Sequence, residues 1–255
     1  MALKKIIEGE EYNPLNTNPR IDNHEYVDLG LPSKTLWACF NIGSNGIQKS
    51  GNKFIWGDST IYTKSINWVD YKFVTKYQSN GPVRMPIPIG RGYTLEEKRN
   101  NEEIHKIMKE DYAREHLVKY TLIGKDDVYN KNCWGMPNRI NPDNKMVLDL
   151  IDDTAHILWG GRWKMPTKGD YEELIRELEW DWVTINDVRC LKGESKNGRC
   201  IYFPMPFTTD EYWSSSLCNT EEQYAYALRA NSSSISLTKC LRIFNKYIRP
   251  VLKKY

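Results

Sequence analysis

The last forty residues constrain the fold of this chain more than any other part. Short runs in which apolar and polar residues alternate, such as 224–230 and 234–237, make up much of this segment. Alternation with a period of two is typical of strands that bury one face. The segment opens on Tyr-Trp-Ser-Ser-Ser (212–216) and closes on Arg-Pro-Val (249–251). We therefore expect short strands and turns from Val183 onward, with this segment held at both ends.

The composition of the same segment indicates a binding surface. Between its two ends it is rich in Ser, Tyr, Asn and Arg. Tyr offers a wide amphipathic contact area with few torsions to freeze, and Ser and Asn offer adaptable hydrogen bonding, as in antibody paratopes. No catalytic constellation is visible in it. The segment therefore favours ligand binding over catalysis.

Overall composition excludes several classes of protein. With 40% hydrophobic residues, nine Trp and sixteen Tyr in 255 residues, the chain is not a disordered one. A net charge of +3 from 36 cations and 33 anions lacks the basic stripe of a nucleic-acid binder. No run approaches the roughly 20 apolar residues of a membrane span, so we expect no membrane insertion. No secretory signal is visible, which predicts a virion-associated or cytoplasmic protein unless a leader has been removed.

Turn residues and apolar runs suggest the order of elements. Residues 1–22 are polar and read as an extended arm. Prolines and glycines crowd 79–93, which predicts irregular structure there. The strands expected before that segment and the helices expected after it occupy these ranges: strands at 25–28, 35–42 and 54–57, and helices at 95–117, 148–158 and from Thr167, where Thr167 and Asp170 form an N-terminal cap.

Several sequence blocks, taken in order, resemble one known family. They are His-Glu-Tyr-Val-Asp-Leu-Gly-Leu-Pro-Ser (24–33), Thr-Leu-Trp-Ala (35–38), the stretches 143–150 and 159–167, Tyr-Trp-Ser-Ser (212–215) and Arg-Pro-Val (249–251). They are similar to C-type-lectin-like domains of gut Bacteroides and their phages, some known as the Fibrobacter major paralogous domain.

This resemblance implies an α+β class. It implies a C-type lectin-like fold with short antiparallel strands, two core helices and a helical insertion. The domain would span 23–251, with the insertion at 79–142 and a candidate variable region at 211–251. In this fold the terminal strands pair, so we expect the strand near Tyr26 to lie beside the one near Ile248.

One group within this fold consists of variable proteins of diversity-generating retroelements, which rewrite a C-terminal segment through adenine-directed mutagenesis. Resemblance to that group implies a non-enzymatic protein that binds a protein or glycan on a cell surface, with no cofactor. Asn codons altered at their adenines cannot encode Lys, Glu or Gln, so we expect Glu221, Glu222, Gln223, Lys239 and Lys246 to be fixed. The candidate ligand-binding residues are then Tyr224, Tyr226, Arg229, Ser232, Ser234, Ser236, Thr238, Arg242, Asn245 and Tyr247. Asn245 stands where relatives often have Gly, so a left-handed backbone is one reading of that position.

Two alternatives stay open. The chain could be an undiversified surface or structural interaction module of the same fold. It could also be an oxidase, because Arg162 followed by Pro166-Thr167 resembles formylglycine-generating-enzyme-like domains. That activity requires a matched cysteine pair, and Cys218 and Cys240, the only C-terminal candidates, do not stand in the enzyme's motif. We therefore expect no catalytic residues.

No metal site is expected either. Asp149, Asp152 and Asp153 could supply oxygens to calcium, but an acidic turn at a helix N-terminus is the simpler reading. His24 and His156 are expected to satisfy buried hydrogen bonds. Cys190 and Cys200 flank an expected hairpin turn and could approach each other, although free thiols are favoured.

Burial follows from the same reading. We expect a large aromatic core that includes Trp37, Trp56, Trp159, Trp163 and Trp213. Trp213, Ile235 and Val251 should be buried. The side chains expected to point outward on one face are Tyr226, Arg229, Ser234, Ser236 and Tyr247.

Overall fold

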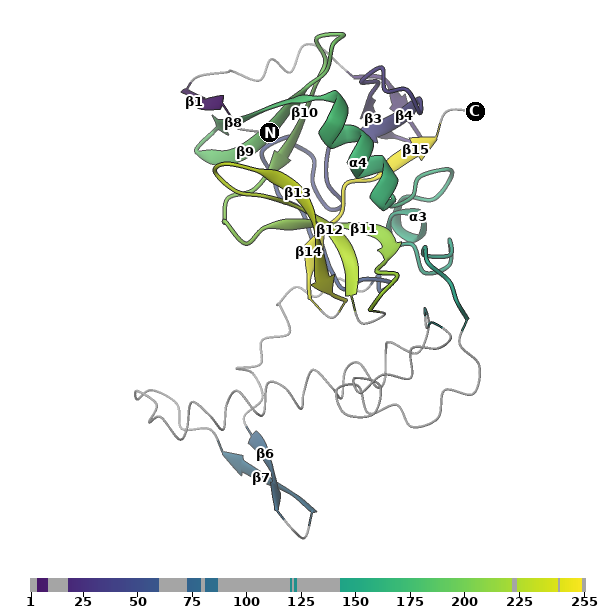
Figure 1. Ribbon diagram of the computed structural model, residues 1–255, viewed down its shortest axis with the longest axis vertical. Coiled ribbons are helices and arrows are strands. Elements are labelled where there is room, and N and C mark those ends of the chain that lie inside the picture. Colours follow the sequence, from purple (N-terminus) through teal and green to yellow (C-terminus); the bar gives the residue numbers. More distant parts are fainter. Residues whose placement is uncertain are drawn as a thin grey trace. The chain divides into compact units, whose positions relative to one another are not determined.

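The computed structural model describes residues 4–8, 18–59, 73–78, 81–86, 120, 122, 143–221, 224–242 and 244–253 (Figure 1). The chain divides into two compact units. Unit 1 comprises 1–63 and 145–255, and unit 2 comprises 64–144. The insertion expected at 79–142 falls largely within unit 2, and its helix at 95–117 lies outside the described residues.

The largest sheet of unit 1 is built mainly from the C-terminal segment. Its strands follow the order β13-β12-β11-β14-β5, and their bounds are β13 Ile235–Leu241, β12 Tyr224–Ala230, β11 Glu211–Leu217, β14 Lys246–Tyr247 and β5 Lys53–Phe54. Most neighbours are antiparallel, and β11 pairs in parallel with β14. The alternating runs in the sequence therefore form adjacent strands of one sheet.

A second sheet joins the two ends of the domain. Its order is β15-β4-β3-β2, with β15 at Val251–Lys253, β4 at Thr35–Ala38, β3 at His24–Val27 and β2 at Arg20–Ile21. Val251 pairs with Trp37 in antiparallel register. The partner of the last strand is thus β4, and β3, which contains Tyr26, lies on the far side of β4. The expectation that the strand near Tyr26 lies beside the strand near Ile248 is wrong by one strand.

The third sheet has the order β1-β8-β9-β10, with β1 at Lys4–Glu8, β8 at Glu179–Ile185, β9 at Val188–Glu194 and β10 at Cys200–Pro204. Part of the polar N-terminal arm therefore pairs, in parallel, with the edge of β8. The turn between β9 and β10 contains Gly198 at φ 77°, a left-handed conformation that costs glycine little. Cys190 pairs with Pro204 and Cys200 with Glu194, so the hairpin keeps the two thiols apart.

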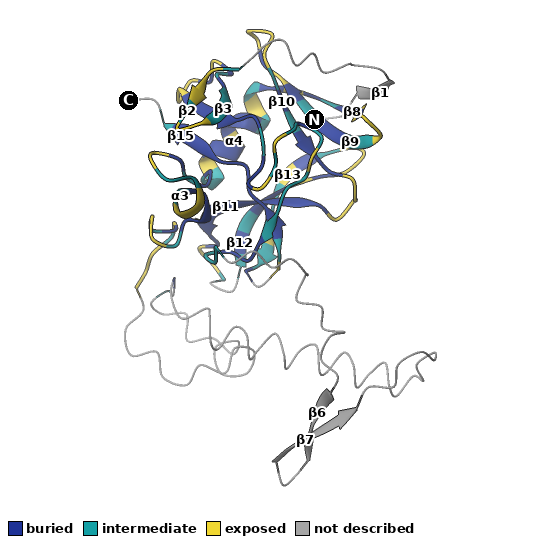
Figure 2. Cartoon of the chain, turned by 180° about the vertical axis from the view of Figure 1, so that it is seen from behind, coloured by how far each residue is buried: buried dark blue, intermediate teal, exposed yellow. Residues whose placement is uncertain are grey.

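The expected α+β class is wrong. Among the described residues there are fifteen strands and only two helices, α3 (Thr154–Trp159) and α4 (Lys168–Glu177), so the described structure is predominantly antiparallel β. In α3 only Thr154 and Ala155 are buried, and Figure 2 shows its ribbon largely exposed. It is therefore a short surface helix and not a core helix. The long strands β8, β9, β11, β12 and β13 supply the core instead.

Helix α4 begins where the sequence predicted. Thr167 accepts a hydrogen bond from the Asp170 backbone, and the Asp170 side chain accepts one from the Thr167 backbone, which is a capping box. Tyr171, Leu174 and Leu178 are buried, and the helix packs against β11, β12 and β13. This contact holds the helix on one face of the five-stranded sheet.

The main core contains aromatic side chains from all three sheets. Trp37, Trp56, Trp163 and Trp213 are at most 1% exposed, as expected, and Ile235 and Val251 are also buried. Trp159 is only half-buried. An aromatic core of this kind lets short strands and irregular loops bury enough apolar surface to be stable.

In unit 2 the structure describes a hairpin of β6 (Phe73–Gln78) and β7 (Gly81–Pro86). The expectation of irregular structure from residue 79 is therefore wrong for 81–86. Each strand of a two-stranded hairpin has an edge, and an edge tolerates proline because an N–H that points to solvent is not needed for pairing.

Candidate ligand-binding surface

The five-stranded sheet has two faces that differ in chemistry. Residues paired across neighbouring strands point to the same side of a sheet. The register places Tyr212, Leu228 and Leu237 together, and these side chains join the main core. We call this the inner face. The residues between them, which include Glu211, Arg229 and Ser236, form the outer face.

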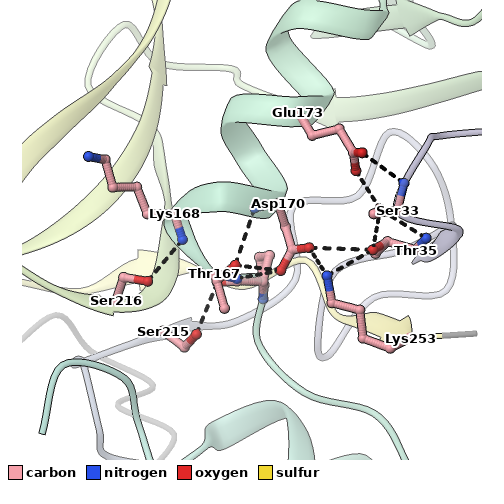
Figure 3. Close-up of polar contacts among 10 residues, drawn as sticks. Ser33, Thr35, Thr167, Lys168, Asp170, Glu173, Ser215, Ser216 and Lys253 are labelled. Atoms are coloured by element: carbon pink, nitrogen blue, oxygen red, sulfur yellow. Dashed lines mark hydrogen bonds and ion pairs between the residues drawn. The ribbon is translucent and has the colours of Figure 1, made fainter. Parts of the chain in front are cut away.

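The inner face is fixed by hydrogen bonds between β11 and the start of α4 (Figure 3). Ser215 N donates to Pro166 O at 2.7 Å, and Lys168 N donates to Ser216 Oγ at 2.9 Å. These two bonds explain why the Ser-Ser-Ser run follows Trp213: small hydroxyl residues let the helix N-terminus approach the strand and satisfy its polar groups.

A second polar group ties α4 to the ends of the domain. Asp170, 4% exposed, accepts from Lys253 Nζ of β15 and from Thr35 Oγ1 of β4 at 3.4 Å. Glu173 accepts from Ser33 N at 2.9 Å (Figure 3). The helix, the first hairpin and the last strand are therefore held together, and the five-stranded sheet rests on a fixed base.

Four polar side chains cross the outer face in one row. Ser236 pairs with Arg229 in the register, Arg229 pairs with Glu211, and Lys246 of β14 contacts Glu211 from the other side. Arg229 Nε lies 3.5 Å from Glu211 Oε1. Glu211 is 8% exposed and Lys246 is 7% exposed, whereas the Arg229 side chain is 51% exposed. The row thus contains a buried ion pair, Glu211 with Lys246, and beside it the exposed cation of Arg229.

Cys240 belongs to the same cluster. Its thiol donates to Glu211 Oε2 at 3.2 Å. Burial raises the pKa of Cys240 to about 11, Lys246 opposes that rise, and Glu211 adds to it. The thiol is therefore neutral at neutral pH, and a neutral thiol is a poor nucleophile.

The turn between β12 and β13 is held by one side chain. Asn231 Oδ1 accepts from Ser233 N at 2.9 Å and from Ser234 N at 2.8 Å, and both serine hydroxyls also lie within 3.1 Å of it. Trp182 Nε1 donates to Asn231 O at 3.0 Å, which ties the turn to β8. The exposed end of the hairpin is therefore ordered before any ligand arrives.

Half of the ten sequence-predicted site residues meet at this end of the hairpin. Arg229, Ser232 and Ser236 are exposed, and Ser234 and Thr238 are half-buried. Arg229, Ser236 and Thr238 lie on the outer face, and Ser232 and Ser234 lie in the adjoining turn. We call these five residues the hairpin surface. Sequence reasoning missed Glu211, Asn231 and Trp182, which support it; only Asn231 carried a signal, since Asn before serines is typical of a turn.

Tyr224 and Tyr226 lie on the opposite side of the sheet, both half-buried. Lys168 Nζ lies 4.6 Å from the centre of the Tyr226 ring. Burial raises the pKa of Tyr226, the neighbouring Cys218 raises it further, and Lys168 lowers it. These tyrosines do not share a face with Arg229, so the structure does not bring all the predicted residues into one surface.

The remaining three candidates lie outside the hairpin surface. Arg242 is 3% exposed, with its guanidinium 4.6 Å from the centre of the Trp56 ring. Tyr247 is 5% exposed and packs against Tyr212 at a ring separation of 5.5 Å, so the expectation that it points outward is wrong. Asn245 is half-buried and does not have a positive φ, so its backbone is not left-handed.

Asp153 has a structural role. It is the N-cap of α3 and accepts from Ala155 N, His156 N and Met165 N.

Among the described residues no cluster of three or more His, Cys, Asp or Glu side chains could hold a metal ion. His156 Nδ1 lies 3.3 Å from Trp163 O, while His24 stacks on Trp159 with ring centroids 3.7 Å apart.

The two C-terminal cysteines do not form a pair. Cys218 Sγ lies 3.3 Å from Thr220 Oγ1, and Cys240 contacts Glu211. All five cysteines in the described part of the chain are free. Although burial raises the pKa of Cys218, hydrogen bonds from Thr220 and nearby backbone amides lower it overall. The Cys218 residue is nevertheless 0% exposed, which closes the thiol to an external substrate.

Comparisons with protein-family models, with curated proteins and with solved structures gave no match. Across the described residues, no helix combines the length and apolar character needed to cross a membrane.

Proposed function

We propose that this chain is a non-enzymatic binding protein that contacts a protein or glycan on a cell surface through the hairpin surface. The observation that carries the proposal is the gathering of Arg229, Ser232, Ser234, Ser236 and Thr238 at one ordered end of a sheet. A preorganised surface spends less binding energy on ordering its own side chains.

The chemistry of this surface suits adaptable recognition. Arginine donates several hydrogen bonds in a planar fork, and serine and threonine hydroxyls both donate and accept. Behind the strand residues of this surface, Tyr212 and Leu228 on the inner face are completely buried. The exposed side chains can therefore be exchanged without disturbing the packing beneath them.

The proposal is tested with a triple variant, Arg229→Ala with Ser232→Tyr and Ser236→Tyr. A matched control replaces the exposed Lys196 and Arg199 in the β9–β10 turn with Ala. Both proteins and the parent are screened on a glycan array and against surface proteins extracted from gut bacteria. We expect the triple variant to lose the parent's ligands and the control to keep them. Retention of every ligand by the triple variant would show that the hairpin surface does not bind.

We further propose that retroelement mutagenesis diversifies this surface. Because Arg242 and Tyr247 are buried, fewer codons are expected to vary than the sequence alone suggests. Codons for the hairpin surface should vary, whereas those for Arg242 and Tyr247 should not. The test is to sequence the genomic DNA that follows the gene and to look for a near-copy repeat with adenine differences. If the differences concentrate in the codons for Arg242 and Tyr247, the assignment is wrong; if no repeat exists, the protein is an undiversified binding module.

Binding should not depend on a metal ion. No acidic cluster suited to calcium is present in the described residues, and the polar groups of the hairpin surface are hydroxyls and a guanidinium. Repeating the screen in EDTA should therefore leave the ligand profile unchanged. Loss of all ligands in EDTA would contradict the proposed mode of binding.

A further inference from the structure

The guanidinium of Arg249 is a buried cation without a carboxylate partner. The residue is 0% exposed. Its Nε donates to Asn41 Oδ1 at 2.8 Å, and its two terminal nitrogens donate to three carbonyl oxygens, of Ala38 (3.1 Å), Cys39 (2.8 Å) and Tyr202 (2.6 Å). All four acceptors are neutral. No ion pair joins Arg249 to an acid in the described part of the chain.

Nearby ionisable groups do not supply the missing negative charge. Burial raises the pKa of Cys39 and of Cys190 to about 12, and Arg249 lowers it only in part. Both thiols are therefore neutral at neutral pH. Asp170, which is close enough to influence Tyr171, is already paired with Lys253. A fully buried guanidinium left in this state carries a large desolvation cost.

Two other buried donors in the same part of the core lack a hydrogen-bond acceptor among the described residues. Trp37 Nε1 and Tyr171 Oη have no hydrogen-bond partner among the described residues, and both side chains are 0% exposed. Their ring centroids lie 5.3 Å apart. Buried polar groups nearly always have a partner, so two adjacent exceptions call for an explanation.

The register places these donors around one region of the core. Trp37 pairs with Val251, which follows Arg249 by two residues in the chain. The Phe203 ring lies 6.3 Å from the Trp37 ring and 4.8 Å from the Arg249 guanidinium carbon. Arg249 also acts on Tyr171 electrostatically. Trp37, Tyr171 and Arg249 therefore lie in the same region of the core, around Phe203.

Only an acceptor of hydrogen bonds fits such a site. The indole nitrogen can donate but not accept, and a guanidinium has five N–H groups, of which four are used here. The phenol can donate as well. We propose that this region binds a buried monovalent anion of halide size, held by Trp37 Nε1, Tyr171 Oη and the charge of Arg249. The anion neutralises the guanidinium and gives both orphan donors an acceptor.

The first test measures thermal stability of the full chain in sodium chloride, sodium bromide and sodium gluconate at equal ionic strength. An anion that binds only the folded protein raises Tm with its concentration. We expect chloride and bromide to raise Tm by about 3 °C or more over gluconate. Equal melting temperatures in the three salts would overturn the proposal, because a water molecule or an empty site gives no halide dependence.

The variant Tyr171→Phe separates the site from a general salt effect. It removes one donor and keeps the ring that packs in the core, and Tyr26→Phe, at a half-buried tyrosine of another cluster, is the matched control. We expect Tyr171→Phe to lose most of the halide dependence and Tyr26→Phe to keep it. Equal halide dependence in both variants would overturn the assignment.

A crystal grown or soaked in sodium bromide gives a readout that does not depend on any variant. An anomalous peak within hydrogen-bonding distance of Trp37 Nε1 and Tyr171 Oη is the expected result. Continuous core density with no peak there would overturn the proposal, whatever the melting data show.

Discussion

Two consecutive carboxylates at the start of β11 show how single residues organise this sheet. Asp210 and Glu211 are both buried, and each is met by a lysine: Lys53 for Asp210 and Lys246 for Glu211. Alternation along a strand sends neighbouring side chains to opposite faces. The two carboxylates therefore link β11 to β14 through Glu211, and to β5, the next strand beyond β14, through Asp210.

Lys53 allows a pH test of this arrangement. Burial by itself lowers the pKa of Lys53, but the hydrogen bond to Asp210 at 2.8 Å and the neighbouring Tyr247 outweigh it, and the net pKa is raised. A raised lysine pKa contributes stability below the unfolded value of 10.5, and this contribution is lost as pH rises through the folded value.

We therefore expect Lys53→Met to lower the free energy of unfolding by about 1 kcal/mol at pH 8, a figure reduced because the Lys53 side chain is 37% exposed and screened by solvent. The deficit should shrink once the pH exceeds the folded pKa, which lies above 10.5. Urea unfolding of parent and variant across this range measures it. A deficit that stays constant into the alkaline range would mean that the ammonium charge does not stabilise the fold.

At the residue scale, the sequence predicts which apolar residues are buried better than it predicts whether a tyrosine or an arginine points to the core or to solvent. Trp213, Ile235 and Val251 are buried as expected because apolar residues flanked by polar ones carry a clear pattern. Tyr247 and Arg242 carry none, since a tyrosine or an arginine suits either a surface or a core. Their burial depends on Tyr212 and Trp56, which are distant in sequence and which no local pattern connects to them.

At the scale of elements, helix α3 shows where a composition argument fails. Leu148 to Leu158 has enough apolar residues for a helix, yet the helix begins only after Asp153, whose side chain caps it. Leu150, Ile151, Ile157 and Leu158 are 40% exposed or more, so their apolar character does not report a buried face. The capping box of α4 was predictable because its two hydrogen bonds join residues three positions apart.

The turn between β12 and β13 makes an element-scale prediction. Asn231→Ala should cost about 1–2 kcal/mol, because it leaves two backbone amides of the turn without their acceptor. Asn231→Asp, which keeps Oδ1, is the matched control. Hydrogen exchange of residues 230–236 should speed up in Asn231→Ala and stay near the parent rate in Asn231→Asp. Equal protection in all three proteins would show that Asn231 does not order the turn.

At the scale of unit 1, the sequence anticipated a segment held at both ends but not the architecture around it. The entry at Trp213 and the exit at Arg249 are both completely buried. The wrong α+β class was implied by the family resemblance, whereas the number of strands depends on pairing between distant segments. Such pairing, for example of β5 with β14, leaves no local signal in two-residue strands.

Division of unit 1 into a fixed scaffold and an exchangeable surface predicts unequal effects of mutation. Trp213→Ala removes a completely buried ring whose Nε1 donates to Phe54 O at 2.9 Å, and should cost about 3–5 kcal/mol. Ser236→Tyr changes an exposed side chain and should alter stability by less than about 0.5 kcal/mol. Thermal melts of the two variants measure the difference. Similar losses in both would refute the division.

Pairing between β4 and β15 also has a kinetic consequence. It joins Trp37 to Val251, more than two hundred positions along the chain, so a large loop must close before this ladder stabilises anything. High contact order of this kind slows folding. Under the proposed diversification, changes confined to the β12–β13 hairpin would leave this loop closure unaltered. Variants of the proposed binding surface are therefore expected to fold at nearly the same rate as one another.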